Sequence, residues 1–347
     1  MHANTSLRTF RVVRLEFQNG VQTAVVEGSA GQYRRCRQQA TTTPSNLQPY
    51  KFCTGMFLKK SCNILYRHEV NSLIHWRNCS SLIIKAREKL ASLGEGQVSL
   101  VKDNGSGIAT ITLAHEQKKN ALSGKMMVQL ADIVEELDSW SLGKGVILQA
   151  QGDTFCSGGD LTTVRAISNP EDGLLMSTFM HKTLTQLYCL PLITVCLVHG
   201  KALGGGAELT TVTDYRILTT EGKIGFVQGR MGVVTGWGGG TRLVKLLGSR
   251  FALELLSTCR MLNGNEAFEI GLADHIVDVV NRHDETKNWL TARISHEPEV
   301  IQAMKKILIG ARDLSLEDGL LNERLNFAPL WGGPANIRAL DKNIKHK

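Results

Sequence analysis

The sequence of 347 residues lacks several features that define common protein classes. It has no apolar run of the ~20 residues needed to cross a membrane, and Arg8, Arg11 and Arg14 interrupt the place where a secretory signal has its apolar core. Its 8 Cys form no CxxC pairs, and the 10 scattered His supply no metal-ligand spacing. We therefore expect no membrane partner and no bound metal, and we interpret the cysteines as reduced thiols.

Acidic residues are scarce only in the first quarter of the chain. Of the formal net charge of +8, residues 1–93 carry +10, from 14 Lys and Arg against 4 Asp and Glu, so the remainder carries −2. A basic balance can indicate a nucleic-acid partner, but the main body of the chain does not have it. The sequence predicts a basic, largely disordered extension over residues 1–93 and one globular domain over residues 94–347.

Strand and helix patterns alternate from about Gly94 onward. Apolar runs rich in β-branched residues predict strands, and apolar residues at helical spacing predict helices. The predicted strands are 107–113, 144–150, 192–198, 215–218 and 223–226. The predicted helices begin after Ser123, after residue 161, at about Glu171 and after Gly206, and the chain beyond Trp237 is mostly helical. This alternation predicts an α/β fold.

Two glycine-rich turns each follow an apolar strand and lead into a helix. They are residues 155–161 (FCSGGDL) and 202–208 (ALGGGAE). Such turns expose backbone N–H groups at a helix start, and glycine lets a ligand approach the backbone closely. Two turns facing one point would form an oxyanion hole. Each alone can also be a tight strand–helix connection, and Gly204 to Gly206 lack the spacing of a dinucleotide site.

Four segments, in this order and spacing, resemble the enoyl-CoA hydratase/isomerase (crotonase) superfamily. They are residues 119–123 (KNALS), 155–161, 202–208 and 238–243 (GGGTRL). The resemblance covers residues 94–347 and implies the ClpP/crotonase fold of repeated β-β-α units with a helical C-terminal region. It also implies an acyl-CoA substrate, no further cofactor, no nucleic-acid partner, and assembly as a homotrimer or a dimer of trimers.

The resemblance also implies roles for individual residues. Gly159 and Gly205 would donate the two oxyanion N–H groups, and Glu208 matches the first of two glutamates that hydratases of the family place across the bound water. The CoA site would be lined by Lys119, Ala121 and Ser157. Asp160 is interpreted as a carboxylate at a helix start, and Arg242 as a packing residue without a catalytic role.

The place of the second glutamate is held by Gln228, counted back from Gly232, and residues 226–232 contain no acid. Because an amide cannot shuttle a proton, efficient hydration is not expected, whereas isomerases of the family use one glutamate. Gln228 either binds a substrate carboxylate or simply occupies the vacated place. Glu208 either becomes protonated beside a substrate carboxylate or has a structural role at the helix start.

A closer resemblance is to members of the superfamily that remove carbon dioxide from malonyl-type acyl-CoA thioesters. It is carried by residues 170–173 (PEDG), 190–193 (LPLI), 236–239 (GWGG), 322–324 (NER) and 331–336 (WGGPAN). Decarboxylation needs no base, because the electrons of the broken C–C bond flow into the thioester carbonyl, where the two N–H groups stabilise the charge.

This resemblance implies a cytosolic enzyme of metabolite repair. A mitochondrial location is the alternative if the basic segment is a transit peptide. Two other functions stay open. One is an enoyl-CoA isomerase or hydratase of the same superfamily. The other is a non-enzymatic RNA-binding protein on the same scaffold, which only the basic N-terminal segment suggests.

Overall fold

The computed structural model describes residues 11–18, 21–27, 33–37 and 72–342. The chain divides into two compact units, Met1–Met56 and Phe57–Lys347. In the first unit, strands β1 (Arg11–Gln18), β2 (Val21–Glu27) and β3 (Tyr33–Arg37) form an antiparallel sheet in the order β1-β2-β3. These strands were not predicted from the sequence.

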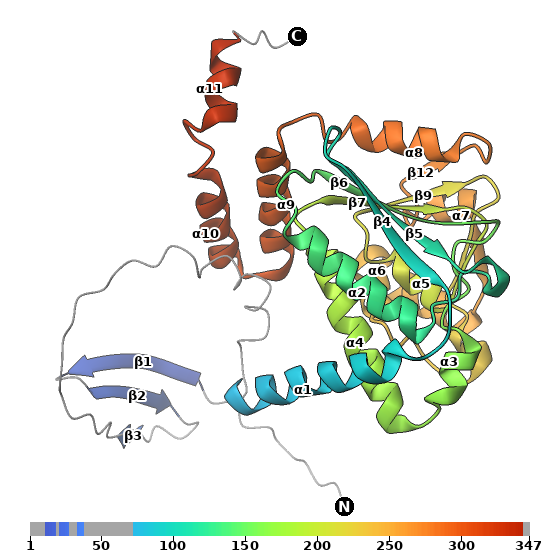
Figure 1. The fold of residues 1–347 in the computed structure, drawn as a ribbon. Coiled ribbons are helices and arrows are strands. Elements are labelled where there is room, and N and C mark those ends of the chain that lie inside the picture. Colours follow the sequence, from blue (N-terminus) through green and yellow to red (C-terminus); the bar gives the residue numbers. More distant parts are fainter. Residues whose placement is uncertain (1–10, 19–20, 28–32, 38–71, 343–347) are drawn as a thin grey trace, which may run out of the picture. The chain divides into compact units, whose positions relative to one another are not determined.

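The second unit is built on a six-stranded sheet in the order β12-β9-β7-β6-β5-β4 (Figure 1). Its strands are β4 (Gln97–Asp103), β5 (Ile108–Ala114), β6 (Gly145–Ala150), β7 (Ile193–Val198), β9 (Tyr215–Thr219) and β12 (His275–Val277). The pair β4–β5 is antiparallel, and all other neighbours are parallel. The central strands β6 and β7 are almost wholly buried, as their continuous apolar sequences predict.

A smaller sheet, in the order β11-β10-β8, gives the fold its repeat. Its strands are β8 (Lys201–Leu203), β10 (Lys223–Gly225) and β11 (Met261–Asn263). Twice, a strand of the large sheet is followed by a strand of the small sheet and then by a helix, as β7-β8-α5 (Gly205–Thr210) and as β9-β10-α6 (Gly239–Thr258). The predicted α/β fold of β-β-α units is confirmed.

Helices cover both faces of the large sheet. Because side chains alternate along a strand, Cys196 and Val198 of β7 join one apolar cluster with α2 (Gly124–Asp138) and α4 (Pro170–Tyr188). Val195 joins a second cluster with α8 (Arg282–Thr291) and α9 (Pro298–Asp313). Ser123 caps α2 as predicted, because its side chain accepts a hydrogen bond from the Met126 N–H.

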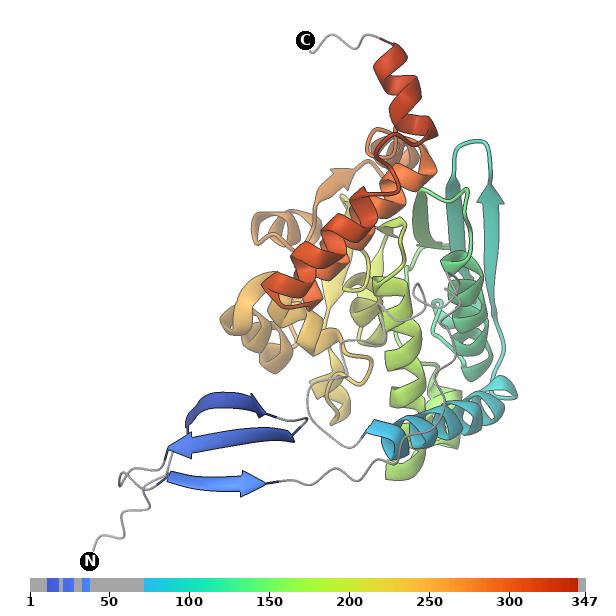
Figure 2. The same cartoon turned by 90° about the vertical axis from the view of Figure 1, so that its left-hand side faces the viewer.

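Helix α1 (Ser72–Ala91) lies within the segment that the sequence assigned to the extension. Its C-terminal half packs on α2 and α4 (Figures 1 and 2). Ala86 and Leu90 are 1% and 2% exposed, and Lys89 forms an ion pair with the buried Asp172 of α4. The compact unit therefore begins upstream of Gly94, where the sequence analysis placed its start.

The C-terminal region is helical, as predicted. After α7 (Gly264–Glu269) and α8 come α9, α10 (Leu316–Phe327) and α11 (Pro334–Asp341). Helix α10 packs on α9, and α11 extends beyond the rest of this unit in both views (Figures 1 and 2). Among the described helices, none is long and apolar enough to span a bilayer.

Candidate active site

The two glycine-rich turns are in direct contact. The Cys156 N–H donates to the Lys201 carbonyl at 3.1 Å, and the Leu203 N–H donates to the Cys156 carbonyl at 2.9 Å. The approach is so close that a Cβ on Gly206 would lie 2.1 Å from the Cys156 oxygen. Only glycine fits at that position, and the two turns that the sequence placed apart meet at one point.

The predicted CoA-binding residues lie beside the first turn. The Leu122 N–H donates to the Gly158 carbonyl at 2.8 Å, and the Ser157 N–H donates to the Lys119 carbonyl at 3.0 Å. Residues 119–122 and 157–159 therefore run side by side, and this contact brings Lys119, Ala121 and Ser157 next to Gly159. The structure thus groups the residues as the resemblance implies, while their roles remain proposals.

Gly159 and Gly205 present the two main-chain donors. Among the described residues, neither N–H donates a hydrogen bond, and both residues are partly exposed, whereas Gly158 and Gly204 beside them are buried. A Cβ on Gly158 would lie only 3.3 Å from the Gly205 nitrogen, so the turns hold the donors close together. Two unpaired neighbouring N–H groups on partly exposed residues are what an oxyanion hole requires.

The Glu208 side chain is buried, and both of its carboxylate oxygens accept hydrogen bonds from surrounding donors. Its Oε1 accepts hydrogen bonds from Gln228 Nε2 at 2.9 Å and the Gly236 N–H at 3.2 Å. Its Oε2 accepts from the Trp237 N–H at 2.9 Å and the Gly239 N–H at 2.7 Å. A carboxylate has about four acceptor positions, and here every partner is a donor. The side chain is therefore fully engaged by the protein, which favours the structural interpretation of Glu208.

Gln228 stands where the missing second glutamate was expected. Its amide nitrogen donates to Glu208, and its Oε1 is buried without a partner in the described part of the chain. The position counted from the sequence is therefore confirmed as a neighbour of Glu208. Among the residues that the structure describes, no second carboxylate contacts Glu208, so the pair cannot exchange protons as two glutamates would.

Asp160 and Arg242 form hydrogen bonds with backbone groups next to the site. Asp160 caps α3 (Leu161–Ala166), because its Oδ2 accepts a hydrogen bond from the Thr163 N–H at 3.0 Å. Arg242 is 7% exposed and donates from Nη2 to the Trp237 carbonyl at 2.7 Å. Burial lowers the pKa of Arg242 to about 10, so its guanidinium stays charged at neutral pH.

Asn120 is a supporting residue that the sequence analysis missed. Its side chain is buried, accepts from the His115 N–H at 2.7 Å, and donates to the carbonyls of Gln151 and Thr154, each at 2.7 Å. It thereby joins the segment after β5 to the loop after β6. Asn120 also has φ +53°, a conformation in which Asn is enriched among non-glycine residues.

Cys156 lies between the two turns but is a poor candidate nucleophile. It is buried, and burial raises the pKa of its thiol to about 12. The reactive form of cysteine is the thiolate, which is scarce at neutral pH when the pKa is so high. We therefore assign Cys156 to packing, as the sequence analysis did for the cysteines in general.

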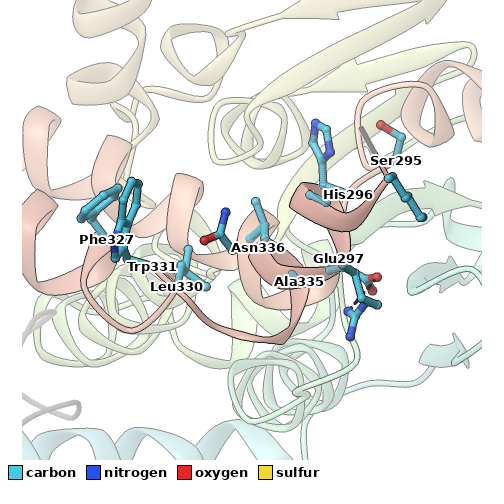
Figure 3. Close-up of a pocket in the computed structure, with 12 residues that line it drawn as sticks. Ser295, His296, Glu297, Phe327, Leu330, Trp331, Ala335 and Asn336 are labelled. Atoms are coloured by element: carbon cyan, nitrogen blue, oxygen red, sulfur yellow. Dashed lines mark hydrogen bonds and ion pairs between the residues drawn. The ribbon is translucent and has the colours of Figure 1, made fainter. Parts of the chain in front are cut away.

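A cavity of about 520 Å³ lies elsewhere in this unit, between the start of α9 and helices α10 and α11 (Figure 3). Phe327, Trp331 and Asn336 line it together with His296 and Glu297. None of the residues predicted for the site contributes to it. We place the active site at the unpaired donors of Gly159 and Gly205, because chemistry depends on those groups and not on cavity size.

Comparison with known proteins assigns the class. The enoyl-CoA hydratase/isomerase family matches residues 103–330, and an enoyl-CoA hydratase of known structure from Bacillus anthracis superimposes with a TM-score of 0.66. That structure is 25% identical and covers 70% of this chain and 94% of its own. The chain belongs to the enoyl-CoA hydratase/isomerase family, as its motifs predict.

Within this family, one group of relatives is considerably more similar. A Xenopus tropicalis protein named ethylmalonyl-CoA decarboxylase is 46% identical over 268 residues, which is 76% of this chain and 88% of the relative. A Mus musculus protein of the same name is 46% identical over 254 residues, covering 72% of this chain and 79% of the relative. The predicted resemblance to decarboxylating members of the family is confirmed.

Proposed function

We propose that this chain is a carboxy-lyase that converts ethylmalonyl-CoA to butyryl-CoA and carbon dioxide, and that it acts less readily on methylmalonyl-CoA. The observation that carries the proposal is the pair of unpaired N–H groups on Gly159 and Gly205, next to an acid–base site in which Gln228 replaces one carboxylate. Such a site can stabilise an enolate without the acid–base pair that hydration needs. The name shared by the vertebrate relatives supports the substrate.

In the proposed reaction, the bond between the α-carbon and the carboxyl carbon breaks, and carbon dioxide leaves. The electron pair moves through the α-carbon to the thioester oxygen, where Gly159 and Gly205 donate hydrogen bonds to the developing charge. The α-carbon then takes one proton to give butyryl-CoA. We infer that this proton comes from water, because Glu208 has all its acceptor positions filled by donors.

We propose that Lys119, Ala121 and Ser157 border the CoA moiety. The three residues lie along the edge of the first turn, beside Gly159. The Lys119 side chain is 60% exposed, and within the described part of the chain it pairs only with the exposed Asp153. An exposed pair of this kind holds its partners weakly, so the ammonium group is available for a phosphate. CoA enters as part of the substrate, and the reaction as written needs no other cofactor.

The experiment is product analysis with the purified full chain. Incubation with ethylmalonyl-CoA followed by mass spectrometry is expected to show butyryl-CoA, and incubation with crotonyl-CoA is expected to show little 3-hydroxybutyryl-CoA. A crotonyl-CoA hydration rate typical of dedicated hydratases, with ethylmalonyl-CoA left intact, would contradict the proposal. Formation of a positional isomer from an enoyl-CoA would favour the isomerase alternative.

We further propose a cytosolic location and assembly as a homotrimer or a dimer of trimers. Free, buried thiols at Cys156 and Cys196 suit a reducing compartment. Imaging of the full chain with a C-terminal fluorescent tag tests the location. Import into mitochondria followed by removal of the basic N-terminal segment would contradict the cytosolic proposal.

A further inference from the structure

The indole ring of Trp237 borders both donor residues of the proposed oxyanion hole. A Cβ built on Gly205 would lie 2.4, 2.7 and 2.8 Å from three atoms of this ring, and a Cβ on Gly159 would lie 3.9 Å from a fourth. Trp237 is 4% exposed, so it packs as part of the core. One flat side chain therefore lies against the backbone that carries the two N–H groups.

Residues of three helices contact Trp237. Its backbone N–H donates to Glu208 of α5 at 2.9 Å, and its carbonyl accepts from Arg242 of α6 at 2.7 Å. Its indole Nε1 contacts the sulfur of Met176 on α4 at 3.0 Å. In the same loop, the Gly236 carbonyl accepts from the Ser177 hydroxyl of α4 at 2.7 Å. Little freedom remains for the ring.

We propose that Trp237 is a positioning residue for the oxyanion donors, and that Glu208 acts through Trp237 rather than by transferring a proton. This inference rests on the proposed decarboxylation. Donors to an oxyanion must lie about 2.7–3.1 Å from the charged oxygen, and a displacement of about 1 Å can cost about 100-fold in rate. The ring fixes the Gly205 backbone from the side on which it could otherwise move.

The hydrogen bonds of Glu208 agree with this role. Three backbone N–H groups of residues 236–239 donate to its carboxylate, at the start of helix α6, which is kinked at Gly248. With the Gln228 amide, these donors fill the acceptor positions of both oxygens, so the carboxylate is engaged by the protein and not by the substrate.

The test of the ring is steady-state kinetics with ethylmalonyl-CoA on Trp237→Ala, Trp237→Leu and Trp237→Phe. We expect kcat to fall about 100-fold in the Ala and Leu variants while KM stays within about 3-fold, because the donors act on the transition state. Trp237→Phe keeps a flat ring but lacks the outer indole atoms that lie against Gly205, so its kcat is expected to fall between those of the wild type and of Trp237→Ala. The Leu variant keeps the core filled if the Ala variant does not fold.

The matched control is Trp289→Ala. Trp289 is partly buried and packs edge-on against Tyr215 at 4.9 Å between ring centroids, on the face of the sheet that carries α8. Its loss is expected to lower the melting temperature but to leave kcat within about 2-fold. Wild-type kcat in folded Trp237→Ala and Trp237→Leu would overturn the positioning role. A wild-type chain without decarboxylase activity would instead overturn the proposed function.

The role of Glu208 needs a readout that structural damage alone does not change. Glu208→Gln replaces an acceptor by an amide donor facing backbone N–H groups, so kcat is expected to fall as in Trp237→Ala. The reaction is then run in deuterated water, and the configuration at the labelled α-carbon of butyryl-CoA is determined. We expect the same configuration as in the wild type. Loss of stereocontrol confined to Glu208→Gln would show that Glu208 delivers the proton and would overturn the inference.

Discussion

At the residue scale, Glu208 combines a position in the family motif with four hydrogen bonds accepted from the protein. Its neighbour Gln228 offers an amide hydrogen bond where a second carboxylate would have competed for protons. Two carboxylates sharing a site raise the pKa of one of them, which hydration exploits. With an amide in that place, Gln228 adds a fourth donor to the three backbone N–H groups from which Glu208 accepts hydrogen bonds.

A substitution at Gly205 tests directly how this backbone donor packs against the Trp237 ring. Gly205→Ala would place a methyl group 2.4 Å from the Trp237 ring, inside the distance that real Cβ atoms adopt. Either the ring or the donor must move, so we expect kcat for ethylmalonyl-CoA to fall about 100-fold or more. Gly173→Ala is the control, because nothing lies within 4 Å of its Cβ position in α4, and alanine favours helix. Equal activity of both variants would contradict the expectation.

His199 gives the fold a pH dependence that is independent of catalysis. It is 3% exposed, neither ring nitrogen has a partner among the described residues, and its pKa is lowered to about 4, first by burial and then by Arg282. The unfolded chain therefore binds a proton between pH ~6.5 and the lower folded pKa, and the native state does not. The contribution of neutral His199 to the free energy of unfolding is fully present above pH ~6.5. It falls as the pH drops toward 4, by at most about 1.4 kcal/mol per pH unit.

Urea unfolding at pH 7, 6 and 5 measures this effect. The free energy of unfolding is expected to decrease with decreasing pH in the wild type. His199→Phe keeps a ring of similar shape without titratable nitrogens. The slope of its unfolding free energy with pH should therefore correspond to the uptake of about one proton fewer than in the wild type. The same slope in both proteins would assign the pH dependence to other groups.

At the element scale, helix α1 decides which part of the basic segment can be removed. Deletion of residues 1–56 takes away only the first compact unit, and we expect turnover to stay within a few-fold. Deletion of residues 1–93 also removes α1, which uncovers the core around Leu90 and leaves Asp172 without its ion pair. Burial of a leucine contributes about 1.5–3 kcal/mol, so the shorter protein should unfold at lower urea concentration. Similar unfolding midpoints for both deletions would contradict this role of α1.

The sequence predicted the elements that have strong patterns and missed those whose burial depends on tertiary contacts. The strands β6 and β7 and the helices α2 and α4 were predicted within a residue or two, because long apolar runs and regular spacing specify them. Strand β4 lies at the edge of the sheet and is mostly exposed, so it has no apolar run to detect.

The residues of the site likewise fall into those that sequence motifs predict and those that depend on tertiary contacts. The glycine turns and Gln228 could be located from motifs, whereas the contact of Trp237 with Gly205 could not, because it joins helices α4, α5 and α6 in space. The motif GWGG marked the position of Trp237 but not its partner. Asn120 was missed for a similar reason, since its hydrogen bonds reach a loop that is distant in the sequence.

At the scale of the whole molecule, the C-terminal helices leave apolar side chains uncovered. On α10 and α11 and the turn between them, Leu316, Leu325, Trp331 and Leu340 are each at least 65% exposed. A group of exposed large apolar side chains on neighbouring helices is typical of an interface. We expect light scattering of the purified chain to give a trimer or a hexamer at micromolar concentration.

Leu325→Asp tests whether this surface forms the interface. A charge buried between subunits without a partner is costly, so the variant is expected to shift toward monomer. Val280→Asp is the control, because Val280 is 83% exposed in the loop before α8 and belongs to neither α10 nor α11. A wild-type monomer, or an unchanged oligomer in Leu325→Asp, would argue against an interface on α10 and α11.

The backbone bridges between the two turns also bear on how the chain acquires its activity. Leu122 pairs with Gly159, and Cys156 pairs with Ala202, so the donors are assembled from segments that are far apart in the sequence. Contacts between distant segments form slowly, because the entropy of closing long loops opposes them. A nascent chain released only as far as β7 already has the first turn but lacks the second. Catalytic competence is therefore acquired late during synthesis, after most of the parallel sheet has been made.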